Sequence, residues 1–134
     1  MDAITELARE ALARGRIVGS GLETVVVPAL PPARRGIGSA LAARIANGRM
    51  FDEDTLGLIE TLRVTLRDVV DARTTLVWEG HEHDPSCGDV VPVRDAETEL
   101  LAQAIGDVAE LWAAIAATLD AARAYRIANE LVAA

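Results

Sequence analysis

The sequence predicts a mostly α fold, a helical bundle with one long C-terminal helix and a small β-hairpin or extended β element. Apolar residues recur at three- and four-residue spacing through most of the 134 residues. Two short runs of strand composition lie close together between residues 74 and 93, and from residue 95 the apolar positions alternate four and three residues apart. No internal repeat or Ser/Gly-rich linker divides the chain, so we expect a single α-rich domain over residues 1–134.

The first half of the chain predicts two helices separated by an extended segment. Residues 2–14 have amphipathic spacing, with Asp2 at the start and Gly15 just after the end. Residues 22–27 are rich in valine and are followed by Pro28, which predicts a strand or extended segment that ends there. Residues 36–46 predict a second helix, closed by Asn47-Gly48 in the left-handed conformation that often ends a helix.

The second half predicts a helix, a hairpin and the long helix. Asp52-Glu53-Asp54 suit the N-terminus of a helix that runs to about residue 73. Residues 74–79 and 89–93 are expected to pair as a β-hairpin (74–93) with a long polar tip, and Pro92 restricts the second strand to an edge. The helix over 95–133 has a possible bend at Gly106.

Composition and charge exclude several functional classes. With 21 acidic and 13 basic residues the net charge is −8, so we expect neither nucleic acid nor an anionic membrane surface as a partner. Every basic residue is arginine, which rules out lysine catalysis, and the single cysteine leaves no intrachain disulfide. The longest uncharged stretch, residues 24–33, is too short to span a membrane, so we expect a cytoplasmic protein or a part of an intracellularly assembled particle.

The long helix carries the strongest pattern in the chain. Its main apolar line, here called the α-seam, consists of six residues: Leu101, Ile105, Val108, Trp112, Ile115 and Leu119. A helix of about 38 residues is about 57 Å long, which is more than the predicted helices over 2–14 and 53–73 can cover. Two interpretations stay open at this point. The seam faces those helices within one chain, or it forms the interface of a homo-oligomer.

The predicted hairpin tip is the densest group of reactive side chains. Residues 79–89 hold both histidines, the only cysteine and four carboxylates. His81, His83 and Cys87 make a candidate zinc site, with Asp84 or Asp89 as a fourth ligand. The spacing matches no standard metal motif, so a solvated tip is the alternative. A Cys/His nucleophile pair is a third interpretation, which lacks a positioned base and an oxyanion pocket.

A second candidate site lies at the start of the helix over 36–46. Arg34-Arg35-Gly36-Ile37-Gly38-Ser39 place two guanidinium groups and two glycines where backbone amides can hold an anion. The alternative is a glycine-permitted turn with two surface arginines.

These patterns favour a non-enzymatic structural or adaptor protein. We expect it to self-associate through its long Ala-rich helix and to contact other proteins of a larger assembly, of bacterial or phage type. The alternative is a small zinc-binding protein that uses the His81, His83 and Cys87 loop. No other cofactor is expected, because no spacing of nucleophile, base or ligand matches an enzymatic motif.

Overall fold

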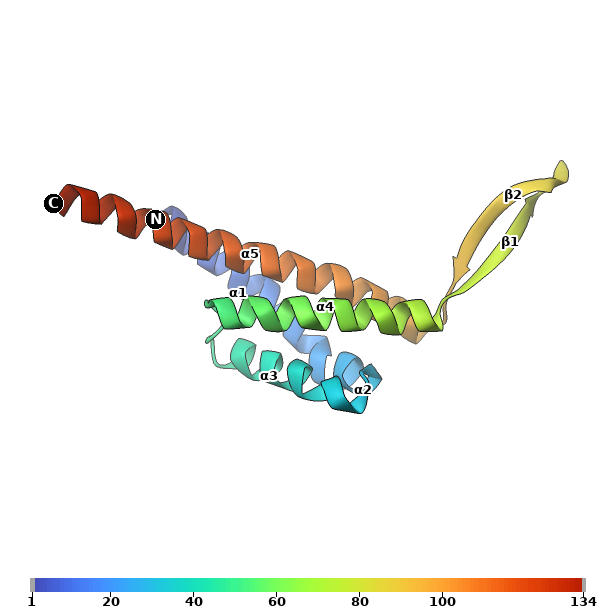
Figure 1. Ribbon diagram of the computed structural model, residues 1–134, viewed down its shortest axis with the longest axis horizontal. Helices are drawn as coiled ribbons and strands as arrows, with labels where there is room; N and C mark the ends of the chain where they lie inside the picture. The colour runs from blue at the N-terminus through green and yellow to red at the C-terminus, as the bar shows by residue number, and fades with distance from the viewer. Residues whose placement is uncertain (1, 134) are drawn as a thin grey trace.

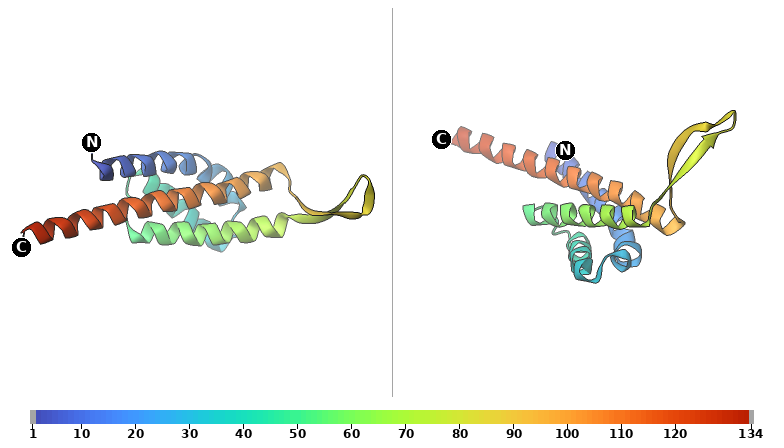
Figure 2. Two further views of the ribbon diagram at one scale, coloured as in Figure 1. Left: turned by 90° about the horizontal axis from the view of Figure 1, so that it is seen from above. Right: turned by 45° about the vertical axis from the view of Figure 1, so that its right-hand side comes forward.

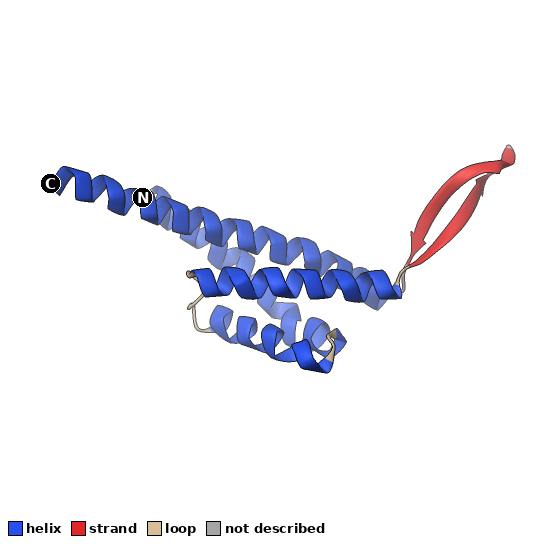
Figure 3. Cartoon of the chain, viewed as in Figure 1, coloured by secondary structure: helices blue, strands red, loops and turns tan. Residues whose placement is uncertain are grey.

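The computed structural model describes residues 2–133 as a helical bundle with a β-hairpin projecting from one end (Figure 1). It is 77% helical, which confirms the mostly α prediction (Figure 3). Its elements are α1 (Ala3–Gly21), η1 (Leu22–Val26), α2 (Val27–Ala29), η2 (Pro32–Arg34), α3 (Arg35–Ala46), α4 (Glu53–Arg73), β1 (Thr75–His81), β2 (Asp84–Val93) and α5 (Ala96–Ala133).

The first helix is longer than predicted. It begins as expected at Asp2, whose carboxylate accepts a hydrogen bond from the backbone N–H of Thr5 at 2.8 Å. Gly15 does not end it. This glycine is buried, and a Cβ added there would lie 3.3 Å from the Sδ of Met50, so the missing side chain serves close packing instead of a helix stop.

The predicted strand over residues 22–27 is wrong, because this segment forms the π-helix η1 followed by the single turn α2. Leu22, Val26 and Leu30 are all buried at four-residue spacing on one side of the chain. Burial of this face against the bundle outweighs the local preference of the valines for extended structure. In the π-turn the backbone hydrogen bonds join residues five apart instead of four. The helix ends at Leu30, whose backbone is extended.

The connection between α3 and α4 follows the sequence closely. Gly48 has a φ of +67°, as predicted for the residue that closes α3. Asp52 caps α4 by accepting hydrogen bonds from the backbone N–H and the hydroxyl of Thr55, at 2.7 and 2.8 Å. Arg44 of α3 donates to the same carboxylate at 3.1 Å and to the Thr55 hydroxyl at 3.0 Å. One polar cluster therefore fixes the angle between the two helices.

The core lies where α5 packs between α1 and α4. Both helices run antiparallel to α5, and α3 covers the side away from it (Figure 2). The largest buried side chains include Leu22 of η1, Leu41 of α3, Met50, Ile59, Leu62 and Leu66 of α4, and Leu101, Leu111 and Ile115 of α5. These side chains form one continuous cluster, as expected for a single domain core.

The hairpin has longer strands and a shorter tip than predicted. β1 and β2 pair antiparallel, with Trp78 opposite Val90, and only Glu82 and His83 remain in the turn. The ladder is irregular between Gly80 and His81. At the base, the guanidinium of Arg94 donates to the hydroxyl of Thr74 at 2.9 Å. The rest of the hairpin projects from the bundle end, and in the part that the structure describes its strands pack mainly on each other (Figure 1).

α5 is a single helix of 38 residues that continues through Gly106. At 1.5 Å per residue it is about 57 Å long, against about 32 Å for the 21 residues of α4. An 18-residue window of α5 has a mean hydropathy of 1.4, and 22% of that window is buried. By length and composition alone, α5 could therefore cross a membrane. A search for uncharged runs alone does not single out α5, because acidic residues such as Asp107 interrupt those runs without removing its apolar character.

Candidate functional site

The hairpin tip holds the predicted zinc ligands without gathering them. The rings of His81 and His83 stack with centroids 5.7 Å apart, and His81 Nε2 lies 3.4 Å from a carboxylate oxygen of Asp89. Cys87 is exposed on β2. Within residues 2–133, no three His, Cys, Asp or Glu side chains converge as a ligand set. The structure thus brings His81 to Asp89 and to His83, but not both histidines to Cys87.

In the candidate anion site at the start of α3, Arg35 and Gly38 contact the preceding segment of the chain. The Arg35 guanidinium donates to the backbone carbonyls of Leu30 at 3.2 Å and Pro28 at 3.3 Å. A Cβ added to Gly38 would lie 2.7 Å from a methyl group of Val27, so this glycine permits contact between α3 and the α2 segment. One of the two arginines and one of the two glycines that suggested an anion site therefore hold the α2 to α3 connection together.

Much of the α-seam faces the interior of the same chain. Leu101, Val108 and Ile115 are fully buried between α1 and α4. Ile105 and Leu119 are half-buried against that core, and Trp112 is 39% exposed. The first of the two interpretations, an intramolecular bundle, accounts for these residues. Of the α-seam residues, Trp112 alone is classed as exposed and remains open to a second copy.

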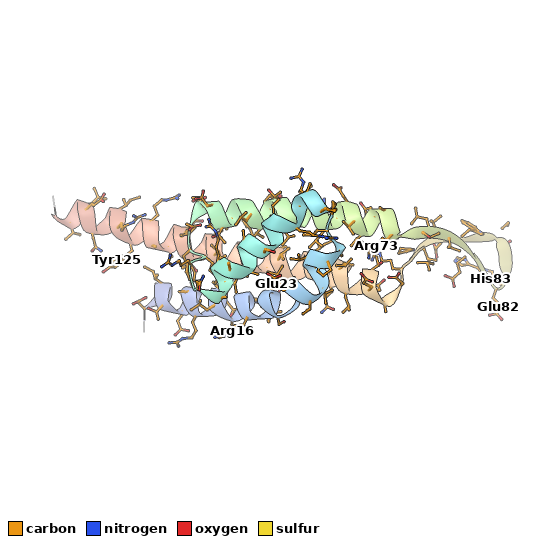
Figure 4. All side chains as sticks on the ribbon, turned by 90° about the horizontal axis from the view of Figure 1, so that it is seen from below. Arg16, Glu23, Arg73, Glu82, His83 and Tyr125 are labelled. Atoms are coloured by element: carbon orange, nitrogen blue, oxygen red, sulfur yellow. The ribbon has the colours of Figure 1, made fainter. Side chains whose placement is uncertain are left out.

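The C-terminal end of α5 is an uncovered helix surface. Residues 123–132, here called the overhang, are all exposed; the first three lie beside the N-termini of α4 and α1, and the rest extend past them (Figures 1 and 4). Arg123 marks the level at which α4 begins, since its guanidinium contacts the Glu53 carboxylate at 3.4 Å. The overhang carries four exposed large apolar side chains: Tyr125, Ile127, Leu131 and Val132.

The overhang continues a line that is buried elsewhere in α5. Leu111 and Thr118 are buried, and Tyr125 and Val132 follow them at seven-residue spacing. Residues seven apart lie on nearly the same side of an α-helix. Val132 is nevertheless 87% exposed and Leu131 74%, because α1 and α4 do not reach them. Sequence periodicity does not reveal where the line passes from buried to exposed, because this depends on where the neighbouring helices α1 and α4 begin.

The hairpin is a second uncovered surface. Leu76 and Trp78 lie opposite Pro92 and Val90 in the ladder, so these four side chains share one face. Leu76 is 70% exposed and Trp78 54%. Both strands are edges, because the sheet has two strands. An exposed apolar face of this kind is typical of an interaction surface.

A groove lies at the hairpin end of the bundle, between α1, η1 and α5. It has a volume of about 240 Å³, and its floor includes Leu22 and Val25 of η1. Ile17 of α1 and Leu100 of α5 form exposed apolar rims. Gln103 and Asp107 of α5 add polar atoms to the lining. We call this the α1/α5 groove.

Charge separates the two ends of the molecule. Residues 79–110, which include most of the hairpin and the first 15 of the 38 residues of α5, hold nine carboxylates and one arginine. Their net charge of −8 equals that of the whole chain. The overhang contains Arg123, Arg126 and Glu130, so its net charge is +1, and both arginines of α5 lie in it. Figure 4 shows Tyr125 of the overhang and His83 of the hairpin tip at opposite ends.

Comparison of the chain with protein-family models, with curated proteins and with solved structures finds no match.

Proposed function

We propose that this chain is a non-enzymatic structural or adaptor protein that self-associates through α5 and contacts other components of a larger assembly. The observation that carries the proposal is the overhang, in which ten consecutive helical residues are exposed and four of them are large and apolar. An apolar helix surface in water is stabilised when a partner covers it.

The hairpin is the surface that we assign to other assembly components. Its apolar face stands clear of the bundle, and its free strand edges offer backbone hydrogen-bonding groups to a partner. Zinc binding by His81, His83 and Cys87 remains the alternative function, and among the described residues no gathered ligand set favours it.

The experiment is native mass spectrometry of the full chain, together with light scattering at several protein concentrations. We expect wild type to contain more than one copy, and Leu131→Glu to shift the mass toward a single chain of 14.2 kDa. Burial of a carboxylate without a partner in an interface is strongly unfavourable. The substituted side chain is exposed, so helicity and melting temperature of the separated chain are expected to be unchanged.

Ala117→Glu is the matched control, because it adds the same charge to an exposed position of α5 inside the bundle region. This control is expected to keep the wild-type mass. A wild type that stays a single chain at high concentration, or an oligomer that Leu131→Glu leaves intact, would contradict the proposal.

A further inference from the structure

We infer that the free edge of β1 binds an extended, basic segment of another protein, which adds to the hairpin as a third, antiparallel strand. The inference rests on the proposed function, because it names the class of partner for the surface assigned there to other assembly components. It concerns the hairpin alone and does not depend on how α5 associates.

Pro92 determines which backbone groups of β1 point away from β2. Facing residues in an antiparallel ladder alternate between pairs that exchange two hydrogen bonds and pairs that exchange none. Pro92 has no N–H to donate, so its pair with Leu76 is of the second kind. The N–H and C=O groups of Leu76 therefore point to the free edge of β1, and by alternation those of Trp78 do as well. The free edge of β2 lacks the donor at Pro92, so β1 is the more complete edge.

These free groups favour an extended partner. The N–H and C=O groups of a strand edge are spaced to pair with another extended backbone, whereas a helix uses its own backbone groups internally. The overhang of a second copy is helical, so its backbone cannot pair with this edge. Leu76 and Trp78 lie on one face of the hairpin and are 70% and 54% exposed. An added strand covers them best with apolar side chains at every second position.

Charge favours a basic partner. Between residues 74 and 93 the chain has four carboxylates and no arginine. Glu79 and Asp89 lie directly opposite each other in the ladder, where like charges are unfavourable. In the ion pairs of the described residues, the hairpin carboxylates meet no arginine, and only His81 contacts one of them, at 3.4 Å from Asp89. A cationic side chain on the added strand beside Glu79 would offset this repulsion.

The same charges disfavour the hairpin of a second copy as the added strand. Each hairpin has a net charge of −4 over residues 75–93, so pairing of two hairpins would bring eight carboxylates together without an arginine. The other elements of the described chain are helices, which leaves no basic strand in this protein to fill the edge. The added strand is therefore a segment of a different protein.

The test measures binding of labelled synthetic heptapeptides to the full chain by fluorescence anisotropy. The probe has the sequence Arg-Val-Arg-Val-Thr-Val-Thr. Added antiparallel to β1, it places valines beside Leu76 and Trp78 and an arginine beside Glu79. The control peptide has the reversed sequence, with the same composition and charge, and places its arginines at the base of the hairpin. The probe is expected to bind at least about threefold more tightly than the reversed peptide.

Methylation of the peptide backbone tests strand addition directly. In the antiparallel arrangement the valine N–H groups of the probe point to β1, whereas the threonine and arginine N–H groups point away. N-methylation of two valines removes two hydrogen bonds and is expected to weaken binding at least about tenfold. N-methylation of one threonine and one arginine is expected to weaken binding by less than about twofold.

Variants of the chain locate the binding site. Glu79→Arg is expected to weaken binding of the probe at least about threefold and to strengthen binding of an analogue with glutamates in place of the arginines. Glu23→Arg makes the same change of charge at an exposed position of η1 and is the control. Leu76→Pro removes an N–H from the free edge of β1 and is expected to weaken binding more than Leu76→Ala does. Val90→Pro removes one from β2 and is expected to have less than about a twofold effect. Cross-strand contacts in NMR spectra confirm the hairpin in each variant.

Several outcomes overturn the inference. It fails if the reversed peptide binds as tightly as the probe, if the two methylated peptides bind equally, or if Glu79→Arg leaves binding unchanged. It also fails if Glu79→Arg instead changes the mass of the wild-type oligomer, because the hairpin then pairs with a second copy.

The same measurements separate the inference from the proposed function. If no peptide binds although wild type self-associates and Leu131→Glu dissociates it, only the inference fails. A wild type that is a single chain and binds the probe in the expected manner contradicts self-association through α5 and leaves the inference standing.

Discussion

Thr118 and Tyr125 lie seven residues apart on one side of α5, yet Thr118 is 6% exposed and Tyr125 is 61% exposed. The hydroxyl of Thr118 donates to the backbone carbonyl of Ala114 at 2.8 Å, inside the region that α1 and α4 cover. Tyr125 lies beside the first residues of α1, from Asp2 to Thr5, where that cover ends. The boundary between core and interaction surface therefore falls within two turns of one helix.

The buried and exposed parts of α5 are expected to respond differently to truncation. Ile115→Ala removes a fully buried side chain between α1 and α4, and it is expected to lower the free energy of unfolding by about 2–5 kcal/mol. Leu131→Ala removes an exposed side chain and is expected to change the free energy of unfolding of the single chain by less than about 0.5 kcal/mol. Urea denaturation at low protein concentration measures both. Equal decreases in the free energy of unfolding would contradict the buried position of Ile115 and the exposed position of Leu131.

The hairpin is expected to open more readily than the bundle. A two-stranded sheet without a packed face is only marginally stable, and among the described residues the strands of the hairpin pack mainly on each other. In hydrogen exchange of the single chain, the amides of β1 and β2 are expected to exchange much faster than those near Leu62 of α4. Protection of the hairpin equal to that of α4 at low protein concentration would show that another surface covers it.

The cap of α4 is expected to make stability depend on pH. Hydrogen bonds from the backbone and side chain of Thr55 lower the pKa of Asp52 below its ordinary value of 3.8, and Arg44 lowers it further. A carboxylate with a lowered pKa in the folded state contributes its full stabilisation above the unfolded value, and this stabilisation is lost as the pH falls through the folded value. Asp52→Ala is expected to cost about 1 kcal/mol of stability at neutral pH.

That difference is expected to shrink as the pH falls below the ordinary value of 3.8 and through the lowered pKa of the folded state, because protonation then weakens the cap in wild type as well. Asp54→Ala is the matched control, because Asp54 lies in the same first turn and is not the capping residue. Denaturation curves of the three proteins between pH 7 and pH 2.5 measure the effect. If Asp52→Ala lowers the free energy of unfolding by the same amount at every pH, ionisation of the Asp52 carboxylate does not contribute to stability.

Zinc is expected to leave the melting temperature unchanged. His81 contacts Asp89 and His83, while the described residues provide no third ligand at the same point. A metal that binds only the folded state raises the melting temperature with its concentration. Thermal scans with zinc and with chelator therefore decide the matter, and His81→Ala shows whether any rise depends on this loop. A rise in wild type that His81→Ala abolishes would restore the zinc-binding alternative.

The helices were largely predictable because periodicity and capping agreed. The acidic cap at Asp52 and the left-handed Gly48 fixed the start of α4 and the end of α3 to within a residue. Residues 22–27 failed because local composition and burial disagreed there. Valine favours strands, whereas the four-residue spacing from Leu22 through Val26 to Leu30 matches a helix that faces the core.

The candidate site was only partly predictable. The sequence showed that α5 is longer than its neighbours and apolar along a seam, but the same spacing suits a partner helix from the same chain or from another. The α-seam residues Leu101, Val108 and Ile115 turned out to be intramolecular. The overhang depends on where α1 and α4 begin, and the groove depends on the π-turn η1, which the valine-rich segment concealed.

One unbroken helix joins the two ends of this molecule, since α5 begins beside the hairpin and finishes in the overhang. Each copy therefore presents its hairpin and its overhang at a fixed relative angle, set by a rod of about 57 Å. In an assembly that joins different surfaces of successive copies, repetition of one contact with a constant rotation either closes into a ring or extends as a filament. The geometry of α5, more than the strength of any contact, would then determine the number of subunits.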